Sequence, residues 1–186
     1  MDKIEYIKEH ISKPIVFIGM MGVGKTHICR EMSLVFNVDF VDADIEIEKA
    51  SAMTIPEIFE RFGEEYFRDG EKRIIKRLIE ENNFLISTGG GAVTTSDTLD
   101  LIKEKTISVW VNADADVIYK RISKNKNRPL LNLPDPKAKI DELMEARQSL
   151  YAQADITIRS EDGAGNGMKN DLIDKLFFVI REEIGR

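Results

Sequence analysis

The sequence predicts a three-layer α/β fold, in which a five-stranded parallel sheet carries helices on both of its faces. Short runs of apolar, β-branched residues alternate along the chain with longer segments whose apolar residues recur at helical spacing. The connections between these segments are short, and strands that alternate with helices in this way favour a parallel sheet. Because 186 residues suit one domain, we expect residues 1–186 to form a single domain.

Five apolar segments are the expected strands. The first, Ile15-Val16-Phe17-Ile18, lies between Pro14 and Gly19, and its length and β-branching are typical of a strand that is buried on both faces. The remaining expected strands are residues 38–41, 84–86, 107–111 and 156–158.

Helices are expected in the segments between these strands. Thr54 or Ile55 precedes a helix with Pro56 in its first turn, and Gly63 is a candidate end for that helix. A helix from Ser96 is expected to begin at a Ser or Asp cap. The other expected helices are residues 25–36, 64–81, 114–123 and 137–151, and a C-terminal helix that carries Leu172, Leu176 and Ile180.

Charge and composition exclude several classes of protein. The net charge of −6 argues against a general nucleic-acid binder, because DNA affinity depends on Lys and Arg that neutralise phosphates. No apolar run reaches the length of a membrane span, and the charged N-terminus does not resemble a signal peptide, so we expect a cytoplasmic protein. The single cysteine, Cys29, is expected to pack in the core, and a monomer is the expected state because no long apolar helix stripe demands a partner.

Residues 19–26 read Gly-Met-Met-Gly-Val-Gly-Lys-Thr and match the pattern G-x-x-x-x-G-K-[ST] in full. The glycines let backbone N–H groups point at phosphate oxygens, and the following helix offers its positive N-terminal end. Lys25 would reach the β- and γ-phosphates, and the Thr26 hydroxyl would ligate Mg²⁺. The segment lies between an expected strand and an expected helix, which indicates a fold of the phosphate-loop NTP hydrolase type that binds nucleotide phosphates. A GTPase, a motor ATPase and a small-molecule kinase would all share this loop.

Two further polar segments follow expected strands directly. These are Asp42-Ala43-Asp44 and Gly89-Gly90-Gly91, and ligands of parallel sheets bind at the carboxyl ends of the strands. If residues 42–44 are extended, Asp42 and Asp44 face the same side. One carboxylate could then support Mg²⁺ and the other could accept a proton from an acceptor hydroxyl. The alternative is a solvated acidic loop in which Asp44 caps a short helix.

Several longer motifs follow in a fixed order. They are TIPEIFERFGEEYFRDGE (residues 54–71), ISTGGGAV (86–93), NRPLL (127–131) and RQSLY (147–151). Together with the phosphate loop and Asp42-Ala43-Asp44, this set resembles the shikimate kinase family over about residues 14–159. The resemblance implies transfer of the ATP γ-phosphate to the 3-hydroxyl of shikimate, on the route to chorismate and aromatic amino acids.

The resemblance also implies roles for individual residues. Shikimate would be held by Asp44, Arg68, Gly89, Gly90, Gly91 and Arg147, in a helical region of about residues 44–75 and the segments facing it. ATP would contact Gly22, Val23, Gly24, Lys25, Thr26, His27, Arg121 and Arg128, and Thr26 and Asp42 would support Mg²⁺. The catalytic residues would be Lys25, Asp44 and Arg128, the last of these in a lid of about residues 124–136. His27 stands where the family usually has a second Ser or Thr, so it either contacts the α-phosphate region or points away.

The residue chemistry agrees with this assignment, although simpler readings exist. Arg68 and Arg147 present the forked donors that a carboxylate binds, and glycines admit a close ligand. Alternatively, Arg68 forms a surface ion pair with Glu64, Glu65 or Glu71, and Arg147 pairs with Glu142 or Glu145. Two other functions predict different sequences. A related kinase for another polyol acid such as gluconate would lack the combined motifs, and a non-catalytic nucleotide-binding module would have lost Lys25, Asp44 or Arg128.

Overall fold

The computed structural model describes residues 2–123, 134–161 and 167–185. Its five strands are all parallel, in the order β2-β3-β1-β4-β5. The strands are β1 (Ile15–Ile18), β2 (Phe40–Asp42), β3 (Leu85–Ser87), β4 (Ile107–Asn112) and β5 (Ile156–Arg159). The predicted fold class is therefore confirmed, and β2 begins two residues later than expected.

The centre of the sheet is the best buried part of the molecule. All four residues of β1 and all three of β3 are buried, whereas β5 at the edge alternates buried and exposed residues. Continuous burial is what a parallel strand with helices on both faces requires. Val16 of β1 aligns with Ile86 on one side and Ser108 on the other, so β1 is held in register by both neighbours.

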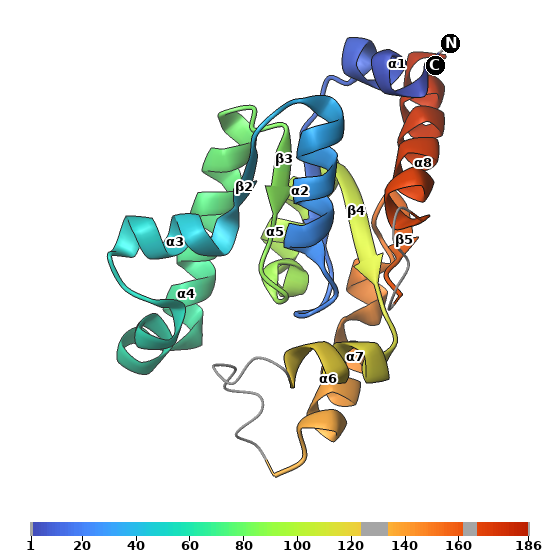
Figure 1. Ribbon diagram of the computed structural model, residues 1–186. Helices are drawn as coiled ribbons and strands as arrows, with labels where there is room; N and C mark the ends of the chain where they lie inside the picture. Colours follow the sequence, from blue (N-terminus) through green and yellow to red (C-terminus); the bar gives the residue numbers. More distant parts are fainter. Residues whose placement is uncertain (1, 124–133, 162–166, 186) are drawn as a thin grey trace.

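Helices cover both faces of this sheet (Figure 1). On one side lie α2 (Lys25–Phe36) and α8 (Gly167–Ile184), with α1 (Lys3–His10) across their ends, and on the other lie α4 (Ile55–Glu80) and α5 (Ser96–Lys105). The chain also forms α3 (Ala43–Ser51), the 3₁₀ turn η1 (Ala92–Thr94), α6 (Ala115–Ile122) and α7 (Pro136–Tyr151). In Figure 1 the strands point downward, and both termini lie together at the opposite end.

Helix α1 was not anticipated from the sequence. Asp2 caps it by accepting the Ile4 N–H at 3.0 Å, and only Ile7 within it is buried. Its other support comes from α8, where Tyr6 contacts the Phe177 ring with 5.0 Å between centroids. A short helix with one buried residue shows little apolar periodicity in its sequence. Its packing partner, α8, lies at the far end of the chain, so local sequence does not indicate the contact.

Two helix caps differ from expectation. Asp42, not Asp44, caps α3, since an Asp42 carboxylate oxygen accepts the Asp44 N–H at 3.1 Å. Helix α5 is preceded by Thr95, whose hydroxyl bonds to Thr98 at 2.9 Å and caps no backbone N–H. The cap of α3 therefore lies two residues before Asp44, and the cap of α5 lies one residue before Ser96.

The start of α4 agrees with the sequence. Thr54 is its N-cap and forms a reciprocal capping box with Glu57, with Pro56 in the first turn. Gly63 interrupts the helix geometry with φ 79° and ψ 177°, and the helix continues in a new direction to Glu80. Gly63 therefore acts as a kink between two helical segments.

The core contains Cys29 as expected, because its side chain is fully buried. Burial raises the pKa of its thiol, which keeps it neutral. Trp110, in β4, is half-buried. Its ring emerges at the carboxyl end of β4, stacks on Tyr151 and lines a cavity of about 190 Å³. Among the described helices, none is long and apolar enough to cross a membrane.

Candidate active site

The loop between β1 and α2 is shaped by three glycines with positive φ. The values are 135° at Gly19, 78° at Gly22 and 101° at Gly24, which is also the N-cap of α2. Residues with side chains adopt this region rarely, so the loop depends on glycine at these positions. The conformation leads the chain from a buried strand into the N-terminus of a helix, the end that attracts phosphate.

Lys25 is the first residue of α2 and is only 7% exposed. Its ammonium group donates to the carbonyl oxygens of Gly19 at 2.7 Å and Met20 at 2.9 Å. A buried cation needs such partners, because an unpaired charge in the interior is costly. The loop thus folds around its own lysine, which holds a positive charge where a phosphate would bind.

Oxygen donors from three elements meet beside the loop. The Thr26 hydroxyl donates to an Asp42 carboxylate oxygen at 2.9 Å, and the Ser87 hydroxyl lies 3.4 Å from the Thr26 oxygen. Hard oxygen ligands of this kind suit Mg²⁺, which is usually held by one or two carboxylates together with substrate phosphates. The described residues contain no cluster of three or more His, Cys, Asp and Glu side chains that could hold a metal alone. The donor set therefore fits a magnesium ion that is shared with a nucleotide.

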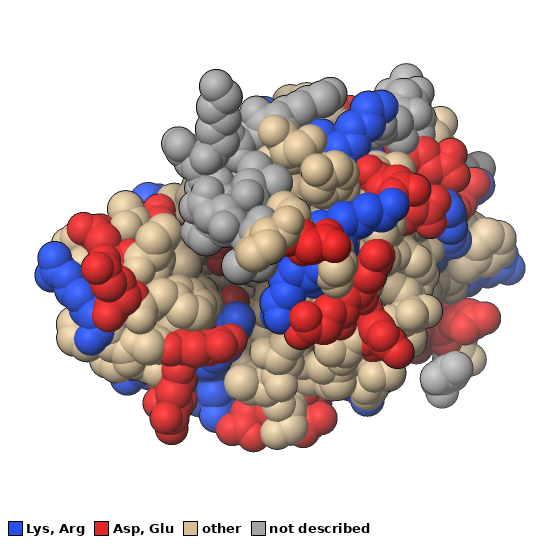
Figure 2. Space-filling view, turned by 90° about the horizontal axis from the view of Figure 1, so that it is seen from below, with Lys and Arg blue, Asp and Glu red and all other residues tan. Residues whose placement is uncertain are grey.

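A hollow of about 220 Å³ joins this loop to the predicted acceptor residues. It is lined by the phosphate-loop residues 21, 22 and 24–27 and by Asp42, Asp44, Ser87, Thr88, Gly89 and Gly90. Figure 2 views the molecule from the carboxyl ends of the strands, where acidic and basic side chains lie side by side around a central depression. We call Gly19–Thr26 with Arg121 the nucleotide wall, and Asp44, Arg68, Gly89–Gly91 and Arg147 the acceptor wall.

Asp44 reaches the hollow by a different route from the one expected. It lies in the first turn of α3 and not in an extended segment, so strand alternation does not align it with Asp42. A Cβ atom on Gly89 would lie 2.7 Å from an Asp44 carboxylate oxygen. The helix therefore places Asp44 directly over the glycine segment, while Asp42 faces Thr26.

Arg68 is held by two carboxylates on its own helix, as the simpler reading proposed. Its guanidinium donates to Glu71 at 2.6 Å and to Glu64 at 3.2 Å. The two partners differ in exposure, because the Glu71 side chain is 2% exposed and that of Glu64 is 66% exposed. Burial raises the pKa of Glu71, opposed by Arg68 and assisted by the nearby Asp44 charge. The free-energy cost of burying the Glu71 carboxylate is thus offset mainly by its ion pair with Arg68.

The Arg68 pairing does not remove it from the acceptor wall. A Cβ atom on Gly91 would overlap the Arg68 guanidinium, so this arginine lies against the glycine segment. A Cβ atom on Gly90 would lie 2.9 Å from the Met21 nitrogen of the phosphate loop. The absence of a side chain at Gly90 lets the two walls approach each other, and its absence at Gly91 lets Arg68 lie against the glycine segment.

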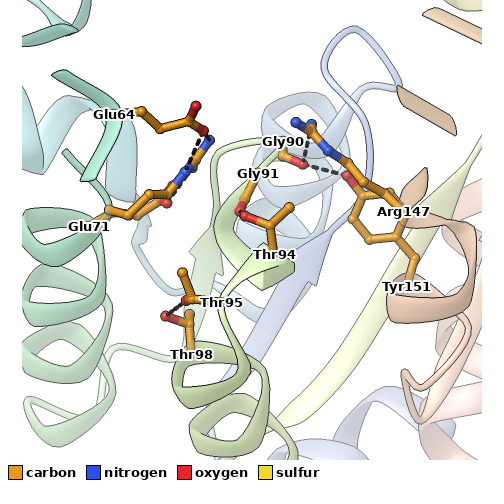
Figure 3. A network of polar contacts seen from close by, with 10 residues as sticks. Glu64, Glu71, Gly90, Gly91, Thr94, Thr95, Thr98, Arg147 and Tyr151 are labelled. Atoms are coloured by element: carbon orange, nitrogen blue, oxygen red, sulfur yellow. Dashed lines mark hydrogen bonds and ion pairs between the residues drawn. The ribbon is translucent and has the colours of Figure 1, made fainter. Parts of the chain in front are cut away.

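Arg147 approaches the same segment from α7. It donates to the Gly90 carbonyl oxygen at 3.2 Å, and the Tyr151 hydroxyl donates to the same oxygen (Figure 3). No ion pair joins Arg147 to Glu142 or Glu145 within the described residues. The two arginines of the acceptor wall therefore flank the glycine segment from opposite sides.

The far end of the nucleotide wall is formed by Arg121 of α6. Its guanidinium donates to the Val23 carbonyl at 3.0 Å, to the Ser160 hydroxyl at 2.9 Å and to the Gly22 carbonyl at 3.5 Å. His27 is exposed at the mouth of the hollow. Arg128 and residues 124–133 of the expected lid lie outside the described residues.

The sequence predicted a common acceptor site for Asp44, Arg68, Arg147 and the glycines. It indicated no role in this site for two of their partners. Glu71 appeared only as a possible surface partner of Arg68, and the three-residue spacing between them was the available signal. Tyr151 lies in the RQSLY motif, one helical turn after Arg147, and this spacing places both side chains on one face of α7.

A phosphate loop that opens on a hollow lined by carboxylates and bare backbone, with two arginines beside its glycine segment, is the arrangement of a phosphate-loop kinase for a small anionic acceptor. A family model described as shikimate kinase matches residues 21–177. The chain belongs to the shikimate kinase family.

Individual proteins agree with this assignment. The chain is 51% identical to a shikimate kinase from Rhodopseudomonas palustris over 81% of its own length and 74% of that protein. It is similar in structure to a shikimate kinase from Acinetobacter baumannii in complex with shikimate, with a TM-score of 0.82, 32% identity, and coverage of 94% and 96% of the two chains. A gluconokinase from Sinorhizobium meliloti gives a TM-score of 0.61 at 9% identity, covering 92% of this chain and 95% of that one, which shows the shared fold alone.

Proposed function

We propose that this protein transfers the γ-phosphate of ATP to the 3-hydroxyl of shikimate, releasing ADP and shikimate 3-phosphate. The observation that carries the proposal is the hollow in which Asp44 and the glycine segment adjoin the phosphate loop, with Arg68 and Arg147 on either side of that segment. Shikimate is a carboxylate with three hydroxyl groups. Two arginines, one carboxylate and exposed backbone suit such a molecule.

On the nucleotide wall, the backbone N–H groups from Gly22 to Thr26 bind the phosphates of ATP. Lys25 exchanges its carbonyl partners for β- and γ-phosphate oxygens and stabilises the negative charge that develops during transfer. Arg121 lies against the adenine end, and His27 contacts the phosphate region from the mouth. Arg128 supplies a further cation to the transferring phosphate, as the family resemblance implies.

Thr26 and Asp42 would hold Mg²⁺ beside the phosphates, with Thr26 as a direct ligand and Asp42 supporting it. When bound, the metal neutralises phosphate charge and fixes the orientation of the γ-phosphate. The hydrogen bond of 2.9 Å between Thr26 and Asp42 already holds both oxygen donors together. The protein thus supplies one hydroxyl and one carboxylate for this purpose.

On the acceptor wall, Arg68 and Arg147 bind the shikimate carboxylate through charge-assisted hydrogen bonds. Asp44 accepts a hydrogen bond from the reacting hydroxyl and takes its proton as the new P–O bond forms. The glycine segment contributes backbone contacts at Gly89, Gly90 and Gly91. Helix α3 and the first part of α4 form the acceptor-binding region, and a monomer contains every residue in this scheme.

A coupled ADP-release assay with shikimate, quinate and gluconate tests the proposal. We expect release that depends on shikimate, with gluconate at the background rate, because gluconate lacks the ring that would span Asp44 and the two arginines. Release that is independent of shikimate would contradict the proposal. Absence of release with every acceptor would favour a non-catalytic nucleotide-binding module instead.

A further inference from the structure

Tyr151, in the last turn of α7, has a buried hydroxyl that the scheme above does not use. Its side chain is 2% exposed, and its hydroxyl donates to the Gly90 carbonyl oxygen. Arg147, one turn earlier, donates to the same oxygen at 3.2 Å (Figure 3). Two donors from one helix face therefore share a single backbone acceptor.

The direction of this carbonyl fixes the direction of the next N–H group. The Gly90 carbonyl and the Gly91 N–H belong to one planar peptide unit, and no peptide bond in the described chain is cis. In a trans peptide the C=O and N–H bonds point in opposite directions. Because the carbonyl points to α7, the Gly91 N–H points away from α7, to the side on which Arg68 contacts Gly91.

The two donors are not equivalent once an anion binds. Arg147 carries a charge, and a carboxylate in the hollow would attract its guanidinium away from a neutral carbonyl. Tyr151 carries no charge, and burial is the main cause of its raised pKa, so its hydroxyl stays protonated and able to donate. The tyrosine can therefore keep the Gly90 carbonyl satisfied while Arg147 turns to the ligand.

We propose that Tyr151 is a positioning residue, which orients the Gly90–Gly91 peptide so that the Gly91 N–H binds the acceptor carboxylate and Arg147 is released to bind it too. This inference rests on the proposed function. It makes one uncharged hydroxyl responsible for the arrangement of two carboxylate donors, Arg147 and the Gly91 N–H.

Packing alone does not fix the tyrosine ring. One side of Tyr151 faces the cavity of about 190 Å³ that Met20, Trp110 and Met144 also line. The Trp110 ring is stacked at 6.0 Å between centroids, and the hydroxyl hydrogen bond supplies the other constraint. A ring that borders a cavity can shift when its hydrogen bond is removed, so the hydroxyl is the part of the side chain to test.

The test is Tyr151→Phe, with Tyr6→Phe as the matched control on α1 at the far end of the molecule. We expect the shikimate KM of Tyr151→Phe to rise about 3- to 10-fold, the range for loss of one neutral hydrogen bond. The ATP KM stays at the wild-type value, and Tyr6→Phe changes neither constant.

Trp110 is the only tryptophan, so its fluorescence gives the shikimate Kd without turnover. A purely structural role would lower the melting temperature and leave the shikimate KM and Kd unchanged.

The methyl ester of shikimate tests whether the effect of Tyr151→Phe on binding depends on the shikimate carboxylate. Wild type and Tyr151→Phe should bind the ester equally weakly, because it lacks the charge that Arg147 and the Gly91 N–H recognise. A penalty of the same size for ester and acid would overturn the inference. If wild-type turnover does not depend on shikimate, the proposed function is wrong. If wild-type turnover depends on shikimate and Tyr151→Phe has the wild-type shikimate KM, only the inference about Tyr151 is wrong.

A measurement on the wild type keeps the inference testable if the variant does not fold. The chain has 12 glycines, so glycine-selective ¹⁵N labelling gives a spectrum with few resonances. The Gly91 amide proton should move downfield on addition of shikimate and not on addition of its methyl ester. A Gly91 resonance that is unmoved by shikimate would contradict the assignment.

Discussion

The nucleotide wall is built mainly from one continuous segment of the chain, whereas the acceptor wall is assembled from residues of several separate elements. Lys25 and Arg121 both donate to carbonyl oxygens of the phosphate loop, within and beside one continuous segment. Arg68 depends on Glu71 of its own helix, and Arg147 depends on the Gly90 carbonyl of another segment. Substitutions in the first wall should therefore affect ATP, and substitutions among the supporting groups of the second should affect shikimate.

The largest expected effect belongs to Arg128, which lies outside the described residues and rests on the family resemblance. Arg128→Ala should keep the fold and lower kcat by a factor of about 10³ or more, as loss of a phosphate-clamping arginine does in other phosphotransferases. Steady-state kinetics and the melting temperature check this together. A variant with wild-type turnover would contradict the role given to this residue.

Lys25→Met should lower kcat by about 10²–10³-fold, because it removes a preorganised cation from the transferring phosphate. It also leaves the Gly19 and Met20 carbonyls without their lysine partner, so the melting temperature should fall. Lys105→Met is the matched control, since Lys105 is 55% exposed at the end of α5 and pairs only with Glu104 among the described residues. A similar loss of turnover in both variants would show that the Lys25 effect is not local.

Glu71→Gln should raise the shikimate KM about tenfold and leave the ATP KM unchanged, because Arg68 loses its buried charged partner. Glu64→Gln removes the exposed partner of the same arginine and should have little effect, as exposed ion pairs contribute little. Equal effects of the two substitutions would contradict the claim that the buried carboxylate positions Arg68.

The raised pKa of Glu71 adds a pH dependence. Arg68, Arg147 and Asp44 face this group, and burial outweighs the two arginines in holding its pKa above the ordinary value of 4.5. As the pH falls, Glu71 is protonated earlier than an ordinary carboxylate, so the shikimate KM should rise earlier. Its contribution to the free energy of unfolding is fully present below pH 4.5 and is lost as the pH rises through its folded pKa. Glu71→Gln should lose this pH dependence of the shikimate KM and of the free energy of unfolding. Steady-state kinetics and urea unfolding, each measured across pH, check the two effects.

The smallest expected effect is at Ser160, which supports Arg121 from the end of β5. Ser160→Ala should raise the ATP KM about 2- to 5-fold and leave the shikimate KM unchanged, because one hydrogen bond to the guanidinium is lost. Ser123→Ala is the matched control, since the exposed Ser123 hydroxyl bonds only to the Lys120 carbonyl within the described part of the chain. A change in the shikimate KM of Ser160→Ala without a change in its ATP KM would contradict the assignment of Ser160 to the nucleotide wall.

The same division explains what could be predicted from sequence. The phosphate loop lies within eight consecutive residues, so its spacing alone indicated its geometry. Asp44, Arg68 and Arg147 were identified by family resemblance, and their approach to the glycine segment required the folded chain. Glu71 and Tyr151 act through contacts whose importance depends on burial, and burial is set by elements elsewhere in the sequence. Helix α1 was missed for the same reason, since α8 supplies much of its packing.

The central claim is that one hollow brings an ATP phosphate and a shikimate hydroxyl together for direct transfer. Phosphorus NMR of the reaction products tests it most directly, because the coupling of the new phosphate signal identifies the carbon that carries it. We expect a monoester on the 3-hydroxyl of shikimate, formed in equal amount with ADP. Inorganic phosphate as the only product, or an ester on another hydroxyl, would contradict the account.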